Sequence, residues 1–286
     1  MKKNSFFFLV SELVRPRQIA GFLFLAVAAA LYAFPVFMSF ISAFRSNGEI
    51  LRNPVGLPNS LYFDNFLFLF TRTELPRAFL NTLLLTAVSE IFIVAVVPMS
   101  SYAIARFPSK WTNGIYAFFI GGMMIPFQAY MISLFKELKT IGLFGTFSGA
   151  ILIYLSGAVA FGTLLFTSFI KTTVPIEIEE SARIDGANGL QVFWQIVFPL
   201  LSPCTASMVI LNGLGIWNDF LMPSLLLSSK KPSALNVVIF HFVGQYNTRW
   251  NIVFAGAVIC IIPAMAIFIA LQKYFIKGIA AGAVKG

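Results

Sequence analysis

The sequence predicts an all-α fold: a polytopic membrane protein whose six transmembrane helices form one domain over residues 1–286. Three observations lead to this prediction. Hydrophobic residues make up 58% of the chain and charged residues 11%, whereas a soluble domain carries about 25% charged residues. Six apolar segments reach the roughly 20 residues that a helix needs to cross the hydrocarbon core. None of them alternates apolar with polar residues, as barrel strands do, so their backbone hydrogen bonds must be helical.

The predicted spans follow one another at residues 19–44, 79–105, 112–134, 147–170, 203–228 and 251–275. The first of these stretches is too long for a secretory signal, so we interpret it as an uncleaved first span. The small residues Ala158 and Gly162 stand four apart, which predicts close approach of the fourth span to a neighbouring helix. Four prolines are expected to kink their spans unless neighbours satisfy the freed carbonyls: Pro35, Pro98, Pro126 and Pro263.

The orientation of the spans follows from the cations between them. With the amino terminus inside, the inner segments carry eleven of the 20 Lys and Arg residues and the outer segments carry nine. The positive-inside rule therefore favours this orientation by a small margin. It places both termini, and the polar segment at residues 171–200, on the cytoplasmic side.

Several classes of function are excluded by composition and motifs. The formal charge of +9 does not indicate nucleic-acid binding, because no basic stripe interleaves with exposed aromatic residues. Cys204, Cys260 and His241 have no second ligand beside them, which argues against a metal site or a disulfide framework. The phosphate-binding pattern GxxxxGK[ST] does not occur, nor does a Ser/His/Asp or paired-carboxylate arrangement. We expect neither an ATP site nor a catalytic residue on this chain.

Two acidic residues, Glu90 and Asp219, lie within predicted spans. A charge at the bilayer centre costs on the order of 2.5–3.5 kcal/mol, so each should face the bundle or a wet cavity. In the fifth span, Asn212, Gly215 and Asp219 stand at i, i+3 and i+7 and therefore share one helix face. This span therefore carries the candidate cavity or substrate path: Asn212, Gly215, Trp217, Asn218 and Asp219.

Other interpretations of these residues stay open. Asp219 and Asn218 could equally form a structural hydrogen-bond network, and Glu90 fits a helix-packing partner better than a substrate ligand. The two acids are also compatible with a self-sufficient secondary transporter or channel that uses Glu90 and Asp219 as a proton or ion relay. A membrane scaffold without transport activity is a third interpretation.

The polar segment at residues 171–200 separates the fourth and fifth spans. Pro175 suits the first turn of a helix, and the three glutamates that follow it complement the positive end of the helix dipole. Gly186 can adopt the left-handed conformation that ends a helix. A second short amphipathic segment then runs to Pro199.

This segment resembles the EAA loop of ABC importer permeases. The pattern of that loop is Glu-Ala-Ala, three residues, Gly, nine residues, Ile, one residue and Leu-Pro. Ser181 and Phe198 depart from it, standing where the pattern has Ala and Leu. The residues that match at the same spacing are Glu180, Ala182, Gly186, Ile196 and Pro199.

The resemblance implies a cytoplasmic coupling helix that docks into a cleft of a separate ATPase subunit. Glu179 and Glu180 would present their charges to that subunit, and Ala182 would keep the docking face small. Gly186 would shape the turn after the helix. The implied ATPase-coupling residues are Glu177, Glu179, Glu180, Ala182, Asp185 and Gly186.

The resemblance covers most of the chain and points to the carbohydrate, maltose-type group of these permeases. It is carried also by residues 101–107, by Met124-Ile125-Pro126 and by Trp217-Asn218-Asp219-Phe220. The last residues of the chain resemble the tail of the shorter of two paired permeases. That tail is expected near the ATPase, with Gly282, Lys285 and Gly286 as its candidate contacts.

The resemblance thus implies a permease subunit of a binding-protein-dependent importer for a sugar or an oligosaccharide, in the bacterial cytoplasmic (inner) membrane. The implied partners are a second permease in a heterodimer, two ATPase subunits, an extracytoplasmic solute-binding protein and the lipid bilayer. Mg-ATP would bind the ATPase, so no cofactor is expected on this chain. The identity of the sugar stays open.

Overall fold

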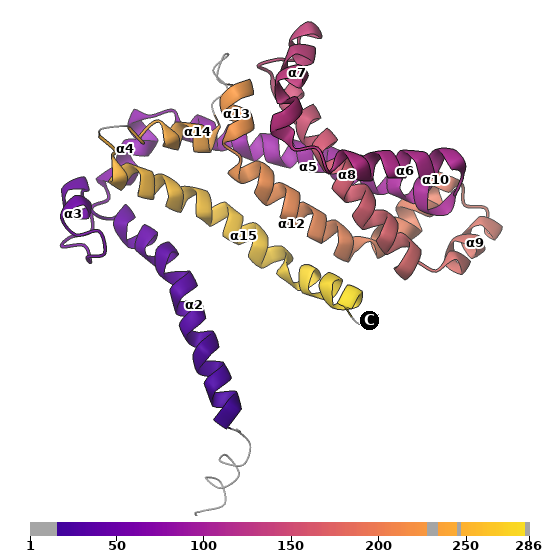
Figure 1. Ribbon diagram of the computed structural model, residues 1–286, viewed down its shortest axis with the longest axis horizontal. Coiled ribbons are helices and arrows are strands. Elements are labelled where there is room, and N and C mark those ends of the chain that lie inside the picture. Colours follow the sequence, from indigo (N-terminus) through magenta and orange to yellow (C-terminus); the bar gives the residue numbers. More distant parts are fainter. Residues whose placement is uncertain (1–15, 228–233, 245–246, 284–286) are drawn as a thin grey trace, which may run out of the picture. The chain divides into compact units, whose positions relative to one another are not determined.

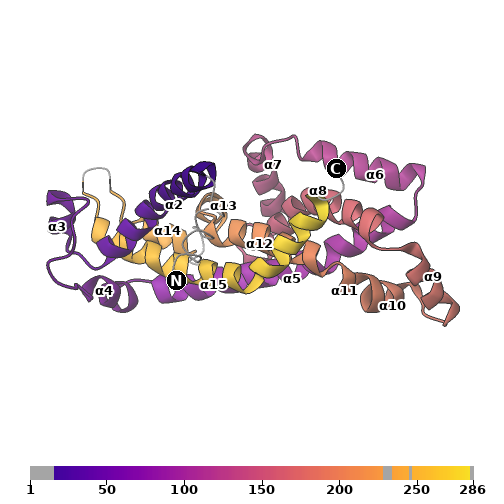
Figure 2. The same ribbon diagram turned by 90° about the horizontal axis from the view of Figure 1, so that it is seen from below.

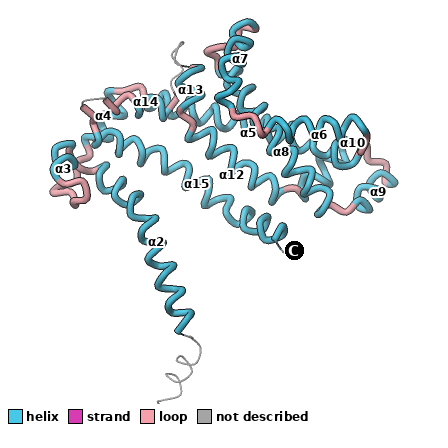
Figure 3. Tube along the Cα trace, viewed as in Figure 1, coloured by secondary structure: helices cyan, strands magenta, loops and turns pink. Residues whose placement is uncertain are grey.

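The computed structural model describes residues 16–227, 234–244 and 247–283, with residues 16–18 and 274–283 described by their backbone alone. The described residues form helices joined by loops and contain no strand, as predicted (Figures 1 and 3). The chain divides into two compact units. The first comprises Met1–Phe68 and Phe242–Val258, and the second comprises Leu69–His241 and Ile259–Gly286.

The first unit is held together by buried polar side chains. It contains α2 (Pro16–Ala43), α3 (Asn47–Arg52), the start of α4 (Asp64–Arg72) and the first turns of α15 (Trp250–Ala283). Arg45 is only 2% exposed and donates hydrogen bonds to three backbone carbonyls within residues 49–54. Asn65 donates to the carbonyls of Ala43 and Arg45 and accepts from Asn251 at 2.6 Å. The Asn65 bonds thus join the end of α2 and the start of α15 to the start of α4.

The second unit holds the remaining helices and the later part of α15. Its short helices α9, α10 and α11 follow the end of α8 and lie together (Figure 2). The bounds are α5 (Leu75–Arg106), α6 (Lys110–Gly122), α7 (Phe127–Thr140), α8 (Phe147–Thr173), α9 (Ile176–Ile184), α10 (Gly189–Gln191), the π-helix η1 (Val192–Val197), α11 (Phe198–Leu200), α12 (Ser202–Asn218), α13 (Leu221–Leu226) and α14 (Leu235–Phe240).

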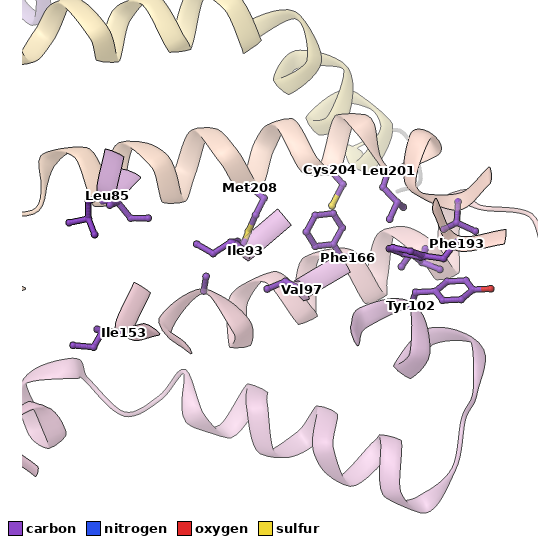
Figure 4. Packing of buried hydrophobic residues seen from close by; sticks show 14 of the residues in the cluster. Leu85, Ile93, Val97, Tyr102, Ile153, Phe166, Phe193, Leu201, Cys204 and Met208 are labelled. Atoms are coloured by element: carbon purple, nitrogen blue, oxygen red, sulfur yellow. The ribbon is translucent and has the colours of Figure 1, made fainter. Parts of the chain in front are cut away.

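The core of this unit forms where α5, α8 and α12 meet. Figure 4 shows Val97, Phe166 and Met208 pointing into the same packed layer. At Gly162 a methyl group would lie 2.5 Å from Val97 Cγ1 and 2.7 Å from Met208 Cε, so only glycine fits without a shift. The close approach predicted from the small-residue spacing at Gly162 is therefore confirmed.

The predicted third span differs from the structure. Residues 112–134 were expected to form one helix, but α6 and α7 are separate helices that meet at 109°. Pro126 explains the break, because proline has no backbone N–H and disfavours a helical conformation at the residue before it. By contrast, Pro35 and Pro263 stay inside α2 and α15.

The predicted fifth span ends earlier than expected. α12 stops at Asn218 instead of residue 228, because Asp219 adopts an extended backbone with φ −66° and ψ 132°. The helical residues before α12, 189–200, join it at a bend of 75°. Among the described residues four helices are long and apolar enough to cross a membrane, and the number reaches six if each bent pair counts as one span.

Candidate functional site

Helix α9 begins and ends as the sequence predicted. Pro175 is its N-cap residue, with an extended backbone. At the other end Gly186 has φ +88°, the left-handed conformation that glycine adopts without a Cβ clash. The N–H of Ala187 then bonds back to the Ala182 carbonyl at 2.9 Å, which satisfies a carbonyl that the helix end leaves free.

One face of α9 is buried against its own chain and carries a charged network. Glu179 is 0% exposed. Its Oε1 accepts from Arg106 Nε at 2.7 Å and its Oε2 accepts from the Tyr102 hydroxyl at 2.7 Å. Arg106 also donates to the Val174 carbonyl at 2.7 Å, and Arg183 donates to the Tyr102 hydroxyl at 3.3 Å. The carboxylate is thus satisfied on both oxygens by residues of α5.

This burial corrects two predictions. Glu179 was expected to present its charge to another subunit, but the guanidinium of Arg106 at the end of α5 draws it inward. Ala182 was expected on the docking face, yet it is buried on the same side of α9 as Glu179, since residues three apart share a helix face. The sequence did not indicate Arg106 as the partner of Glu179, although Arg106 and Tyr102 both lie in the 101–107 segment that carries the family resemblance.

The opposite face of α9 is not covered by the residues that the structure describes. Glu177, Glu180 and Asp185 are exposed there. Three isoleucines of α9 are also exposed, Ile176, Ile178 and Ile184, and of these Ile184, at 86% exposed, shares the face of Glu177 and Glu180. A surface that combines carboxylates with uncovered isoleucines is typical of a protein contact.

The segment after α9 packs on the same end of α5. Asn188 caps α10 by accepting from the backbone N–H groups of Leu190 and Gln191. The π-helix η1 then brings the Phe193 ring to 5.4 Å from the Tyr102 ring (Figure 4). A π-helix is rare and often occurs at functional sites.

A cavity of about 920 Å³ opens between α6, α7, α8 and α12. Three of the predicted path residues line it, Asn212, Gly215 and Asp219. The Tyr154 hydroxyl donates to Asp219 Oδ2 at 3.0 Å, and the Met222 N–H donates to Asp219 Oδ1 at 3.3 Å. Aromatic rings form much of the remaining wall: Phe118, Phe119, Phe127, Tyr130, Tyr154 and Phe161.

The other two predicted path residues lie elsewhere. Trp217 is 1% exposed, and its Nε1–H donates to the Cys260 carbonyl at 3.0 Å. Its ring packs edge-on against Phe79, so Trp217 stabilises the bundle and does not line this cavity. Asn218 lines a second, smaller cavity of about 320 Å³ between α12 and α15.

Glu90 lies inside α5, where it is 8% exposed. Neither of its carboxylate oxygens has a hydrogen-bond partner among the described residues, and the same holds for the hydroxyls of Thr86 and Ser89. A methyl group at Gly213 of α12 would lie 3.7 Å from Glu90 Oε1, which places the carboxyl against that helix. Glu90 does not line the large cavity.

Of the predicted tail contacts, Gly282 belongs to the backbone of α15. Lys285 and Gly286 lie outside the described residues.

The family model of the "Binding-protein-dependent transport system inner membrane component" matches residues 97–281. The chain is 32% identical over 261 residues to the "Melibiose/raffinose/stachyose import permease protein MelC" of Bacillus subtilis (strain 168), with 91% of this chain and 94% of the relative covered. It is 34% identical over 259 residues to the "Probable starch degradation products transport system permease protein AmyC" of Thermoanaerobacterium thermosulfurigenes, with the same coverage of 91% and 94%.

Among solved structures, the fold matches a chain of a bacterial ABC transporter involved in the import of the acidic polysaccharide alginate. The TM-score is 0.79 at 21% identity, over 90% of this chain and 95% of that one. At this identity the match shows the fold.

Proposed function

This chain belongs to the family of binding-protein-dependent transport system inner membrane components, and we propose that it forms, with a second permease subunit, the ATP-driven pathway of a sugar or oligosaccharide importer. The observation that carries the proposal is the family match over residues 97–281, which includes the 171–200 segment and the wall of the large cavity. Permeases of this family are not enzymes, and ATP is hydrolysed on a separate subunit.

The free face of α9 is the proposed contact for the ATPase. Glu177, Glu180 and Asp185 supply charge there, and Ile184 supplies apolar area that this chain leaves uncovered. Interfaces of this kind combine an apolar centre with a polar rim. In the proposed orientation, α9 and both termini face the cytoplasm, and the solute-binding protein delivers the sugar at the opposite side of the inner membrane.

The large cavity is the proposed sugar path. Sites for small molecules are mostly apolar, with a few polar groups that fix orientation. Here aromatic rings form the wall, and the Tyr154 hydroxyl and the Asp219 carboxylate are polar groups that reach it. Relatives named for melibiose, raffinose, stachyose and starch degradation products support a neutral oligosaccharide as the cargo.

The alternative of a self-sufficient secondary transporter needs Glu90 and Asp219 to act in one relay. Only Asp219 lines the large cavity, while Glu90 is packed against Gly213. This separation favours the ABC importer.

Reconstitution tests the proposal. The chain is co-expressed with its second permease and its ATPase, purified through a tag on this chain, and placed in proteoliposomes with the binding protein outside. We expect the ATPase to co-purify, and raffinose or a maltooligosaccharide to enter only when ATP and the binding protein are both present. Uptake by this chain alone, or uptake driven by an ion gradient without ATP, would refute the proposal.

A further inference from the structure

We propose that Arg106, Glu179 and Tyr102 are positioning residues that fix helix α9 to the inner end of α5, so that a displacement of α9 moves this span with it. The inference rests on the proposed function, in which α9 contacts the ATPase. It assigns a role to a buried face of α9 that takes no part in the docking contact itself.

The network joins segments that are far apart in sequence. Glu179 is 73 residues from Arg106 and 77 residues from Tyr102, and both contacts measure 2.7 Å. Arg106 adds a bond to the Val174 carbonyl, directly before the start of α9. One guanidinium therefore holds both the entrance of α9 and its central turn.

The burial of this network makes the attachment stiff. The Glu179 side chain is fully buried and that of Arg106 is 9% exposed. Separating them would leave a charge in a site that water does not reach, which is strongly unfavourable. The planar guanidinium also fixes direction, because its donors point in set directions, unlike a lysine ammonium. α9 can therefore not pivot on α5 without breaking several bonds at once.

Tyr102 extends the same rigid group to the next segment. Its hydroxyl donates to Glu179 and its ring lies 5.4 Å from Phe193 of η1. Beyond η1 the backbone bends by 75° before α12 begins. The bend thus lies between α12 and the group formed by α5, α9 and η1. We expect α12 to move relative to this group at the bend.

The test measures the number of sugar molecules transported per ATP hydrolysed, in the complete transporter reconstituted with its binding protein. Two variants keep the approximate size of the side chains and weaken the network. Tyr102→Phe removes the hydroxyl that bonds to Glu179 and Arg183. Arg106→Lys keeps the charge but replaces the rigid planar guanidinium, which bonds to Glu179 and Val174 through separate nitrogens, with a single ammonium on a flexible stem. Their controls lie on α6, outside the network: Tyr116→Phe makes the same change as Tyr102→Phe, and Lys110→Arg makes the reverse exchange of Arg106→Lys.

We expect both network variants to assemble with the ATPase and to hydrolyse ATP. Substitutions along a coupling route typically change the coupling between two sites to a modest degree. The number of sugar molecules transported per ATP hydrolysed should therefore fall roughly 2- to 30-fold. The two controls should keep the ratio of the unmodified transporter.

Three results would overturn the proposal. An unchanged ratio in both network variants would show that the network does not transmit movement, while the proposed function would stand. Loss of membrane-inserted, detergent-stable protein in both variants, with the two controls unaffected, would show that the network serves folding alone. Failure of the unmodified chain to associate with an ATPase would overturn the proposed function and this inference together.

Discussion

Two buried glutamates in the same compact unit have opposite surroundings. Glu179 on α9 has both carboxylate oxygens bonded, to Arg106 and Tyr102. Glu90 on α5 has no partner for either oxygen among the described residues, and it faces Gly213. Burial is similar, 0% and 8% exposed, so burial alone does not assign a role to an acid in this protein.

The difference lies in what each position requires. A buried, fully bonded carboxylate specifies one geometry for the helices that bond to it, since any other geometry leaves a charge unsatisfied. A buried carboxyl without hydrogen bonds fixes no particular helix geometry, and its burial destabilises the helix bundle. We infer that Glu179 orients α9, whereas Glu90 weakens α5 packing within this chain.

Removal of Arg106 should produce the largest effect on stability. Arg106→Ala removes the nearer and more buried of the two guanidiniums that pair with Glu179, leaving Arg183 at 3.7 Å from Glu179 Oε2. Removal of one partner from a buried pair typically costs about 3–5 kcal/mol, and the remaining Arg183 places the expected loss at the lower end of that range. Lys110→Ala, at the exposed start of α6, should change the free energy of unfolding by less than about 0.5 kcal/mol. Unfolding of the detergent-purified chain by sodium dodecyl sulfate, followed by circular dichroism, measures both. Equal values for the two variants would contradict the role given to the pair.

Replacement of Glu90 should act in the opposite direction. Glu90→Leu removes a polar group that lacks bonds, and relief of such a group is worth about 1–3 kcal/mol. The same unfolding experiment should therefore show a more stable chain. A loss of stability comparable to that of Arg106→Ala would contradict this account and mean that Glu90 has a hydrogen-bond partner beyond the described residues.

The sequence predicted the existence and ends of α9 well, because its signals are local. Pro175 and Gly186 act on the backbone within a few residues of their own position. It could not predict that Glu179 turns inward, because Arg106 is brought there only by the packing of α5 beside α8. The third span differs for another reason: Pro126 gave a local signal for a kink, but the apolar residues continue across it, so hydropathy did not show that the kink is a full break of 109°.

The cavity was partly predictable for a related reason. Asn212, Gly215 and Asp219 share one face of α12, and helix periodicity alone places them together. Trp217 and Asn218 lie on other faces, where their roles are set by α5 and α15. Tyr154 gave no local signal, because its link to Asp219 spans 65 residues.

Asp219 combines features of the two glutamate sites. Its carboxylate accepts hydrogen bonds from Tyr154 and Met222, as that of Glu179 does from its partners, but it lies in the wall of the large cavity. If it guides the sugar, Asp219→Ala should slow uptake in proteoliposomes about two- to tenfold, the size expected from loss of one or two hydrogen bonds. Tyr154→Phe should have a smaller effect in the same assay. Normal uptake by Asp219→Ala at normal expression would remove Asp219 from the path and leave it a structural role.

The central claim is that the exposed face of α9 couples this permease to an ATPase, and one charge reversal tests it most directly. Glu180→Lys changes an exposed carboxylate of α9 and leaves the Glu179 network intact. Asp64→Lys makes the same change at an exposed position of α4 and serves as the control. The amount of ATPase that co-purifies with the tagged chain should fall sharply for Glu180→Lys and stay unchanged for Asp64→Lys. Full ATPase association and full sugar transport by Glu180→Lys would contradict the claim.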